Sequence, residues 1–194
     1  MRSSELKRFT GETKINLNLN IDGTGKCEIN TGIGFLDHML ELFTKHGCFD
    51  IKITCDGDLY VDSHHTVEDI GIVLGQAFKV AAGDLKGVNR YSTKFIPMDE
   101  ALVCVSLDFS GRPYLVYDAD IDNDDVQLYE EFFRAFSNQA NLTLHIRLID
   151  GKNAHHVIEA MFKAAARAMR EALEMDSRIK GIPSTKGFIN WEKE

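Results

Sequence analysis

The pattern H-H-x-x-E occurs twice in this chain of 194 residues, at residues 64–68 and again 91 residues later, at residues 155–159. Each copy opens a stretch in which apolar residues recur at helical spacing. A pattern that returns at a long interval indicates an internal duplication. We therefore expect two similar halves, residues 1–90 and 91–194, that share one core and form one compact body.

The two halves also share an order of predicted elements. In the first half, Ile15, Leu17 and Leu19 alternate with asparagines, which is typical of a half-buried strand. After a turn at residues 22–25, the chain is expected to return as the hairpin partner of that strand. The elements expected in this half are strands at 14–21, 26–30, 49–55 and 59–61 and helices at 35–45 and 65–82.

The second half repeats this plan, with a long helix at its end. The elements expected there are strands at 102–109, 114–117 and 141–149 and helices at 126–137 and 155–174, with a turn at 110–113 after which the chain comes back. From residue 51 onward the halves match without a gap at an offset of 91, whereas the first helices match best at an offset of 93. The sequence therefore predicts an α+β fold built from a tandemly duplicated β-β-α-β-(β)-α unit.

Composition narrows the class of protein. The formal charge of −8 argues against a nucleic-acid surface. No apolar run approaches the roughly 20 residues of a membrane span, and residues 1–10 lack the apolar segment of a signal peptide. The four cysteines form no C-x-x-C motif, so we expect reduced, mostly packed thiols and a cytoplasmic protein without a membrane partner.

Both copies of H-H-x-x-E have the chemistry of metal ligands. Residues three or four apart share one face of a helix, so the glutamate of each copy neighbours both of its histidines. Adjacent histidines point about 100° apart around the helix axis and need not bind the same ion. One such pair would ordinarily be a capping or packing feature, but two matched pairs, each with its glutamate, favour metal binding.

Two further histidines enlarge this set of candidate ligands. His38 lies in the first predicted helix and His145 in the last predicted strand, and neither has a histidine counterpart in the other half. With both included, the set holds six imidazoles and two carboxylates, four groups for each of two ions. Imidazole combined with carboxylate suits Mn, Fe or Zn better than Mg or Ca.

A second group of residues can bind an anion. Residues 181–187, GIPSTKG, combine small residues, two hydroxyls and a lysine, and a turn of this kind can hold a phosphate. Arg90 and Arg112 are further candidates, the latter at the tip of a turn. Each signal alone is equally typical of an ordinary solvated turn.

Taken together, six strings resemble one enzyme family, the monofunctional imidazoleglycerol-phosphate dehydratases of histidine biosynthesis. The strings are TGIGFLDHML at 31–40, DSHHTVEDIG at 62–71, PMDEAL at 97–102, SGRPY at 110–114, GKNAHHVIEA at 151–160 and IPSTKG at 182–187. Each string is only moderately specific, but the ordered set is highly specific and covers nearly the whole chain.

The resemblance implies a fold like that of ribosomal protein S5 domain 2, with two four-stranded sheets packed with helices. It implies a homo-oligomer of 24 subunits, with two Mn²⁺ ions per active site at subunit interfaces and a small phosphorylated imidazole as substrate. The implied metal ligands are His38, His64, His65, Glu68, His145, His155, His156 and Glu159. Several of these (His38, His64, His65, Glu68 and His155) would also contact the substrate, together with Glu12, His46, Arg90, Arg112, Ser184 and Lys186.

The implied reaction converts D-erythro-imidazole glycerol phosphate into imidazole acetol phosphate by loss of water. The C2 hydrogen of the substrate is poorly acidic, because no carbonyl adjoins it. Metals on the ring nitrogens would favour the imidazolate, which can expel the C3 hydroxyl and leave a conjugated diazafulvene with an acidic C2 hydrogen. We expect Glu12 to remove this proton, with Glu68 or a metal-bound hydroxide as alternatives.

Two other classes of function account for part of the pattern. A metal-storage assembly would use the histidines but not Arg90, Arg112 or the IPSTKG turn. A di-metal hydrolase acting on a small phosphate ester would use both groups, but carboxylate-rich bridging ligands would favour it, and this set is rich in imidazole. Release of inorganic phosphate from the substrate would decide for the hydrolase.

Overall fold

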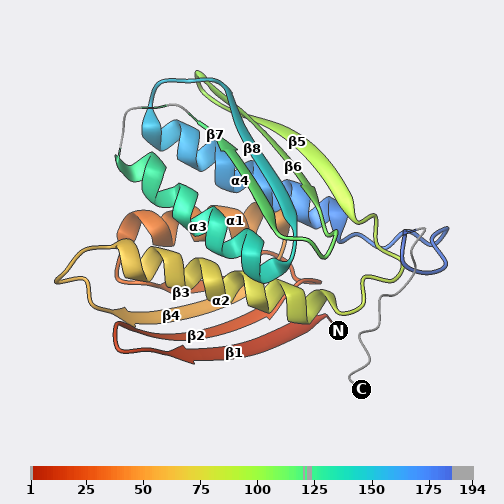
Figure 1. Ribbon diagram of the computed structural model, residues 1–194, viewed down its shortest axis with the longest axis horizontal. Helices are drawn as coiled ribbons and strands as arrows, with labels where there is room; N and C mark the ends of the chain where they lie inside the picture. Colours follow the sequence, from red (N-terminus) through yellow and green to blue (C-terminus); the bar gives the residue numbers. More distant parts are fainter. Residues whose placement is uncertain (1, 120, 122–123, 185–194) are drawn as a thin grey trace.

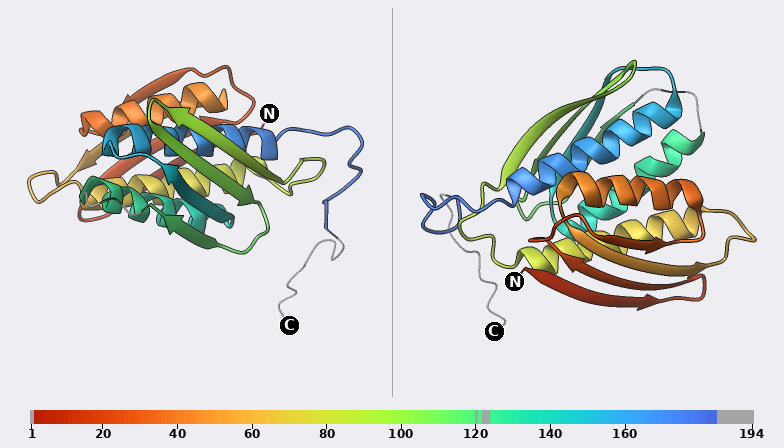
Figure 2. Two further views of the ribbon diagram at one scale, coloured as in Figure 1. Left: turned by 90° about the horizontal axis from the view of Figure 1, so that it is seen from above. Right: turned by 180° about the vertical axis from the view of Figure 1, so that it is seen from behind.

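Two four-stranded sheets enclose four helices in the structure, a computed structural model that describes residues 2–119, 121 and 124–184 (Figure 1). The sheets form the outer layers and the helices lie between them (Figure 2). The strand order is β1-β2-β4-β3 in one sheet and β5-β6-β8-β7 in the other, so the two sheets have the same topology. The predicted α+β class, the duplication and the two four-stranded sheets are confirmed.

Each half contributes four strands and two helices, in the same order. The first half comprises β1 Ser3–Phe9, β2 Thr13–Asn20, β3 Cys27–Asn30, α1 Gly34–Gly47, β4 Asp50–Gly57 and α2 His64–Ala82. The second half comprises β5 Tyr91–Met98, β6 Ala101–Asp108, β7 Tyr114–Asp118, α3 Asp124–Ala140, β8 Thr143–Asp150 and α4 Ala154–Ala172.

The alternation read from the sequence places β2 correctly. Ile15 and Leu17 are fully buried and Leu19 is nearly so, while the residues between them point outward. One face of the strand therefore packs on the helices, as a period of two requires. Strand β6 shows the same alternation in the second sheet.

The predicted hairpin partners of β2 and β6 are wrong. Strand β3 pairs in parallel with β4, and β7 pairs in parallel with β8. In both cases the connection to the paired strand runs through a helix, α1 or α3, which is the usual crossover for parallel strands. The places beside β2 and β6 are occupied instead by β1 and β5 on one side and by β4 and β8 on the other.

Strands β1 and β5 were not predicted, and the strand expected at 59–61 is absent. Strand β1 lies at a sheet edge, where its side chains are only half-buried or exposed, so its sequence shows no strong apolar alternation. Residues 59–61 form a turn, in which the Val61 N–H donates to the Asp58 carbonyl over 2.8 Å. Tyr60 at its tip is 91% exposed, so the apolar letters there do not mark a buried strand.

The four helices pack in two pairs across the middle of the molecule. Helix α2 packs against α3, and α1 packs against α4. The contact of α2 with α3 depends on Gly71 and Gly75, because a Cβ at these positions would lie 2.6 Å from the Phe132 carbonyl oxygen and 2.4 Å from that of Phe136. Buried side chains from both halves form one continuous core.

The offset of 93 between the first helices of the two halves is confirmed at their C-terminal ends. Cys48 after α1 and Asn141 after α3 both adopt the left-handed conformation, with φ of 55° and 53°. The Cys48 N–H donates to the Lys45 carbonyl, and the Asn141 N–H donates to the Asn138 carbonyl. These ends are therefore the same capping device in two copies.

All four helices begin at the same end of the molecule, on the left in Figure 1. We call this the helix-start end, formed by residues 10–12, 31–38, 58–65, 99–100 and 151–156. The opposite end, called the helix-finish end, is formed by residues 83–90, 109–113, 141–142 and 173–184. No described helix has both the length and the apolar character needed to cross a membrane. All four cysteines are free, as predicted, although each is half-buried rather than fully packed.

Candidate active site

A histidine-carboxylate cluster lies at the helix-start end, where α1 meets α4. His38 comes from α1, and His155 and Glu159 come from one face of α4. The Nε2 atoms of both histidines lie 3.4 Å from Oε2 of Glu159. The Glu159 side chain is 8% exposed, whereas the two histidines are about half-exposed. The cluster is therefore buried at its carboxylate and open to solvent at its two imidazole rings.

The start of α4 holds His155 in place. Asn153 is the N-cap, and its side-chain oxygen accepts from the backbone N–H groups of His155 (3.0 Å) and His156 (3.5 Å). This bond satisfies N–H groups that have no partner within the helix. The ring of Phe35 meets the ring of His155 edge-on, with centroids 5.1 Å apart.

Glu159 is fixed from the other side by Lys163, one turn further along α4. The Lys163 ammonium bonds Oε1 of Glu159, so Oε2 is the oxygen turned toward the histidines. Burial opposes ionisation of Glu159, but the hydrogen bond and charge of Lys163, together with His38, outweigh it and lower the pKa of the carboxyl. Glu159 is therefore an anion that can face a cation.

His156, the second histidine of this copy, faces a different partner. Its Nδ1 lies 2.7 Å from Oε2 of Glu100 in the β5–β6 turn. The hydrogen bond that His156 donates to Glu100 raises the pKa of His156, and the same bond lowers the pKa of Glu100 to about 2. The expectation that adjacent histidines point to different surroundings is confirmed for this pair.

His65, the second histidine of the first copy, has an equivalent arrangement. Its Nδ1 lies 3.0 Å from Oδ2 of Asp58, and this hydrogen bond raises the pKa of His65. Oε1 of Glu12, in the β1–β2 turn, lies 3.8 Å from Nε2 of the same ring. A hollow of about 180 Å³ beside this group is lined by Glu12, Asp58 and Tyr60, among others. Glu12 is therefore close to a candidate ligand and open to solvent.

The first copy does not form a cluster like that of the second. His64 is exposed and Glu68 is half-buried. In the part of the chain that the structure describes, His38, His155 and Glu159 are the one group of three metal-ligating side chains whose ligand atoms lie within 4.8 Å of one another. At the offset of 93, α3 carries Glu131 where α1 carries His38.

The donor atoms of the cluster suit a divalent transition metal. Ligands bind such an ion at about 2 Å, so atoms within 4.8 Å of one another can reach one ion with small side-chain movements. Two imidazole nitrogens and one carboxylate oxygen favour Mn, Fe or Zn over Mg or Ca. The residues present therefore fit a metal of the kind that the sequence predicts.

The candidate anion ligands lie at the opposite, helix-finish end. Arg90 immediately precedes β5, and Arg112 is exposed in the turn between β6 and β7. Ser184 is brought to Arg90 by its neighbour Pro183, whose carbonyl accepts from the Arg90 guanidinium over 2.7 Å. Lys186 lies outside the described residues.

Arg90 joins several segments of the helix-finish end. Its guanidinium donates to both carboxylate oxygens of Asp108, over 2.7 and 3.1 Å. Its own backbone is held at a positive φ of 78°, with its N–H donating to the Ala172 carbonyl over 2.7 Å. Such a conformation persists only where the surroundings fix it. The backbone of Arg90 is therefore held in place, and its guanidinium is held beside residue 184 by the bonds to Asp108 and Pro183.

His145 is separated from the other candidate metal ligands. It lies near the start of β8, on the outward face of the second sheet, beside the buried Leu144 and Ile146. Eight residues of strand at about 3.3 Å each span roughly 25 Å, and α4 begins only after the far end of β8. His145 therefore belongs to the helix-finish end, with Arg90 and Arg112, and not to the cluster of its own chain.

His46 lies in the last turn of α1, about two turns beyond His38. Burial lowers the pKa of His46, and the charges of Lys163 and Arg167 on α4 lower it further. The ring therefore stays neutral near physiological pH, beside but not within the His38 cluster.

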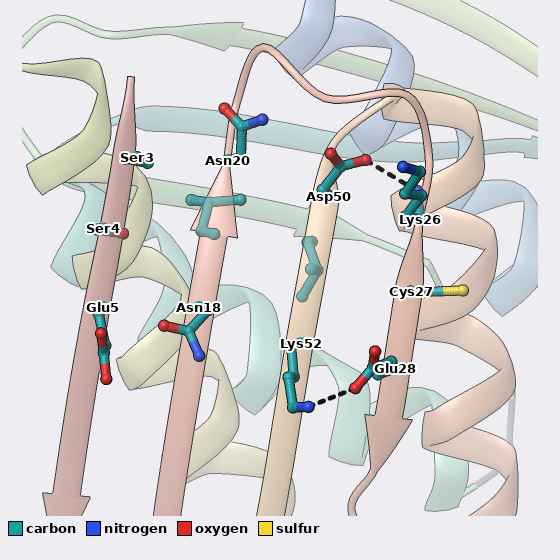
Figure 3. A pocket seen from close by; sticks show the side chains of 12 residues that line it. Ser3, Ser4, Glu5, Asn18, Asn20, Lys26, Cys27, Glu28, Asp50 and Lys52 are labelled. Atoms are coloured by element: carbon teal, nitrogen blue, oxygen red, sulfur yellow. Dashed lines mark hydrogen bonds and ion pairs between the residues drawn. The ribbon is translucent and has the colours of Figure 1, made fainter. Parts of the chain in front are cut away.

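A broader hollow of about 550 Å³ lies elsewhere, over the outward face of the first sheet (Figure 3). It is lined by strand residues such as Asn18 and Lys52 and by Lys26 just before β3, with Lys52 paired to Glu28. None of the predicted site residues lines it. The chemistry of the chain therefore gathers at the sheet ends and not in this hollow.

Asp58, Glu100 and Lys163 contact the candidate ligands, but the sequence did not single them out. Asp58 has a weak signal, since it stands in a turn six residues before His64. Glu100 lies within the family string PMDEAL, but nothing in that string links it to His156, which it meets only through the folding of the second sheet, 56 residues apart in the chain. Lys163 follows Glu159 at a spacing of four, which is common to any helix.

Comparison with known proteins identifies the family. The family model described as imidazoleglycerol-phosphate dehydratase matches residues 31–169. The dehydratase of Caldanaerobacter subterraneus subsp. tengcongensis is 58% identical over 194 residues, covering 97% of this chain and all of that protein. That of Acetivibrio thermocellus is 56% identical, covering 97% of this chain and 99% of its own length.

This chain belongs to the imidazoleglycerol-phosphate dehydratase family. Two solved dehydratase structures have the same fold. The one from Staphylococcus aureus is 44% identical, with a TM-score of 0.80, over 89% of this chain and 99% of that chain. The one from Pyrococcus furiosus is 37% identical, with a TM-score of 0.81, over 95% of this chain and all of the other.

The resemblance read from the six strings is thereby confirmed. Membership makes the chain a hydro-lyase, with the imidazoleglycerol-phosphate dehydratase activity of histidine biosynthesis. A storage protein and a phosphate-ester hydrolase are both disfavoured by the same finding.

Proposed function

We propose that the chain dehydrates D-erythro-imidazole glycerol phosphate to imidazole acetol phosphate in the cytoplasm, with two Mn²⁺ ions in each of its active sites. The active sites would lie between copies of the chain in an assembly of 24 subunits. The observation that carries the proposal is the convergence of His38, His155 and Glu159, which presents two imidazoles and one carboxylate within 4.8 Å of one another.

The separation of the two ends of the chain supports an active site shared between copies. The candidate metal ligands at the helix-start end lie at the far end of the second sheet from Arg90, Arg112 and His145. A strand of eight residues spans roughly 25 Å, and the three-carbon chain between the imidazole and the phosphate of the substrate is far shorter. One substrate molecule therefore needs the helix-start end of one copy and the helix-finish end of another.

Exposed apolar side chains at both ends support the same assembly. Tyr60 and Val61, next to the first histidine pair, are 91% and 55% exposed. Tyr91 and Tyr114, next to Arg90 and Arg112, are 66% and 63% exposed. Exposed aromatic side chains are enriched at protein interfaces, so these residues would be covered by other copies.

Each residue group has a distinct task in the proposed reaction. His38, His155, Glu159 and the other predicted ligands would hold cations that supply positive charge beside the imidazole ring, which favours loss of the C3 hydroxyl and the diazafulvene predicted above. Arg90, Arg112, Ser184 and Lys186 would bind the phosphate and fix the direction of the carbon chain. His46 would help to exclude water from around the carbon chain of the substrate.

Glu12 is the proposed base for the C2 proton. It lies beside His65 without a short hydrogen bond to it, at 3.8 Å, and its side chain is 55% exposed. A carboxylate placed next to the metal ligands, but not holding them, is available to move a proton. Glu68 is the alternative base, since it stands one turn after the same histidine pair.

A metal-dependent turnover assay tests the reaction. The protein would be stripped with a chelator, returned to Mn²⁺ and supplied with the substrate, while imidazole acetol phosphate is followed. Turnover should require Mn²⁺ and be lost in His155→Ala, and it should fall about 10²–10⁴-fold in Glu12→Gln with unchanged metal content, the usual effect of losing a general base. Absence of turnover with Mn²⁺ still bound would contradict the proposal, and near-normal turnover of Glu12→Gln would remove Glu12 as the base.

A complementation experiment tests the shared active site. Arg90→Ala and His155→Ala chains would each be inactive alone. If a site combines the two ends from different copies, chains assembled together at equal amounts should recover roughly a quarter of the wild-type rate, because each intact end is then supplied at random. Continued inactivity of the mixture, with normal assembly shown by light scattering, would place both ends of the site in one chain.

A further inference from the structure

The second histidine of each pair contacts one carboxylate, Asp58 in the first copy and Glu100 in the second. The proposed function gives neither carboxylate a role. Oδ2 of Asp58 lies 3.0 Å from Nδ1 of His65, and Oε2 of Glu100 lies 2.7 Å from Nδ1 of His156. Both contacts engage Nδ1. The other ring nitrogen, Nε2, faces a second carboxylate beyond hydrogen-bond distance in both copies and can turn to a cation. That carboxylate is Glu12, 3.8 Å from His65, in the first copy and Asp99, 3.7 Å from His156, in the second.

Hydrogen bonds within the fold hold the backbone at Asp58 and the side chain of Glu100. The Asp58 N–H donates to the Glu12 carbonyl over 3.0 Å, across the β1–β2 turn, and the Asp58 side chain is only 11% exposed. Glu100 accepts the backbone N–H of Asn153 over 2.9 Å and that of Lys152 over 3.4 Å, so it is tied to the loop that begins α4.

These two anchorings use different parts of the repeat. Asp58 belongs to the loop between β4 and α2, whereas Glu100 belongs to the turn between β5 and β6. The two halves therefore reach the same contact at Nδ1 by separate routes. A chance contact would not be expected to recur in this way at both histidines.

A carboxylate at Nδ1 selects one form of a neutral imidazole. Such a ring carries a proton on one nitrogen only, and an ionised carboxylate can only accept, so the proton resides on Nδ1. The lone pair of Nε2 is then free to bind a cation. Nε2 is also the nitrogen that His38 and His155 turn toward Glu159, so the four rings present the same atom.

We propose that Asp58 and Glu100 are positioning residues that fix His65 and His156 with Nδ1 protonated and thereby tighten the binding of divalent cations. The inference rests on the proposed function, because it takes both histidines as metal ligands. Carboxylates of this kind behind ligating histidines orient the ring and raise its basicity, and their loss costs about 10–100-fold in metal affinity.

The test measures Mn²⁺ affinity of the substrate-free protein by competition with a chelating dye. Asp58→Asn and Glu100→Gln keep the size of each side chain but can donate an amide N–H to Nδ1, which moves the ring proton to Nε2. We expect each variant to bind Mn²⁺ about 10–100-fold more weakly. Glu100→Asp, which retains the carboxylate, should lose less affinity than Glu100→Gln.

An activity measurement separates positioning from a general loss of structure. In both amide variants, the Mn²⁺ concentration for half-maximal turnover should rise in step with the lost affinity, while turnover at saturating Mn²⁺ should stay within a few-fold of the wild type. A parallel fall in turnover at saturating Mn²⁺, together with a lowered melting temperature, would mean that the carboxylates serve the fold and would overturn the inference.

Two matched controls test whether charge alone is responsible. Asp56 stands two residues from Asp58, is 84% exposed and lies 3.8 Å from Lys14. Glu28 pairs with Lys52 on the outward face of the first sheet. Asp56→Asn and Glu28→Gln should leave Mn²⁺ affinity unchanged, and an equal loss in these controls would overturn the inference.

The remaining outcomes distinguish the inference from the proposed function. If the wild type binds Mn²⁺ and both amide variants bind it equally well, the positioning role of Asp58 and Glu100 is wrong and the metal centre stands. If the wild type itself does not bind Mn²⁺, the proposed metal centre is wrong and the inference falls with it.

Discussion

Helices α2 and α4 begin with the same histidine pair, yet they meet different neighbours. In α4, His155 and Glu159 face His38 of α1. Helix α2 packs against α3 instead, and α3 carries Glu131 in the place of His38. The duplicated scaffold therefore has the same shape in both halves but not the same ligands. Among the described residues, only the second histidine pair takes part in a three-residue cluster, and it does so with His38 of the first half.

The packing of α2 and the packing of α4 against their neighbours also differ between the halves. Helix α2 approaches α3 through Gly71 and Gly75, whose missing Cβ atoms leave room for backbone carbonyls. At the matching positions, α4 carries Phe162 and Ala166, and Phe162 fills the core beside Phe132 with ring centroids 5.1 Å apart. Helix α2 of the first half thus packs closely through glycines. Helix α4 of the second half packs through a large aromatic side chain and carries two residues of the His38 cluster at its start.

The largest expected effect comes from removing the residue that distinguishes the two helix starts. His38→Ala should weaken Mn²⁺ binding by at least about 100-fold, since it removes a proposed ligand itself and not merely its support. Metal titration of the substrate-free protein measures this. Glu131→Ala, the matched change in α3, should leave the affinity unchanged. Equal losses in both variants would mean that the halves are functionally symmetric after all.

A smaller effect is expected from closing the space between α2 and α3. In Gly75→Ala the new methyl would lie 2.4 Å from a backbone oxygen that cannot easily move. Overpacking of this kind costs about 1–3 kcal/mol of the free energy of unfolding, which exceeds the roughly 0.5–1 kcal/mol that alanine gains over glycine within a helix. Denaturant unfolding measures the difference.

The matched control for this contact is Gly34→Ala. A Cβ at Gly34, in the first turn of α1, would meet nothing within 4 Å. That variant should be neutral or slightly more stable than the wild type. If Gly75→Ala proved equally neutral, the two helices would have to move apart without loss, and the close contact would not distinguish the first half.

The start of each helix offers a finer comparison. Asn153 caps α4 with its side chain, whereas the side chain of Ser63 makes no capping bond at the start of α2. Asn153→Ala should therefore destabilise the protein by about 1 kcal/mol, and Ser63→Ala by much less. Thermal unfolding of the two variants side by side measures this, and an equal cost at both positions would remove the distinction.

How much of this the sequence could predict follows from the range of the interactions. Alternation in β2 and helical periodicity in α2 and α4 are local, so those elements and the duplication were predictable. The parallel pairing of β3 with β4 was not, because it depends on which strand occupies the place beside β2. Edge strands such as β1 carry little apolar pattern, since one of their faces is barely covered.

The features of the candidate site also divide into those that local sequence predicts and those that depend on the three-dimensional fold. The histidine pairs were predictable because the ligand residues of each pattern lie within five consecutive positions of the sequence. The grouping of His38 with His155 was not derivable from spacing, because it depends on α1 packing against α4. The position of His145 at the far end of the second sheet depends likewise on the three-dimensional fold, as does the contact of Glu100 with His156.

The smallest expected effect concerns pH and His46, which lies where α1 passes α4. Because burial and the charges of Lys163 and Arg167 lower its pKa in the folded protein, the unfolded chain binds a proton at this residue more readily, with a pKa of about 6.5. Stability should therefore be lost as the pH falls through that value, and retained above it.

The comparison with His46→Gln isolates this residue. Between about pH 7.5 and about pH 5.5, the free energy of unfolding of the wild type should fall more steeply than that of the variant. His65 and His156, whose pKa values are raised, act in the opposite direction, because the stability they contribute is lost as the pH rises. They are present in both proteins and cancel in the difference. Parallel curves would show that His46 is as solvated in the folded protein as in the unfolded chain, and that the face between α1 and α4 is open to water beyond the His38 cluster.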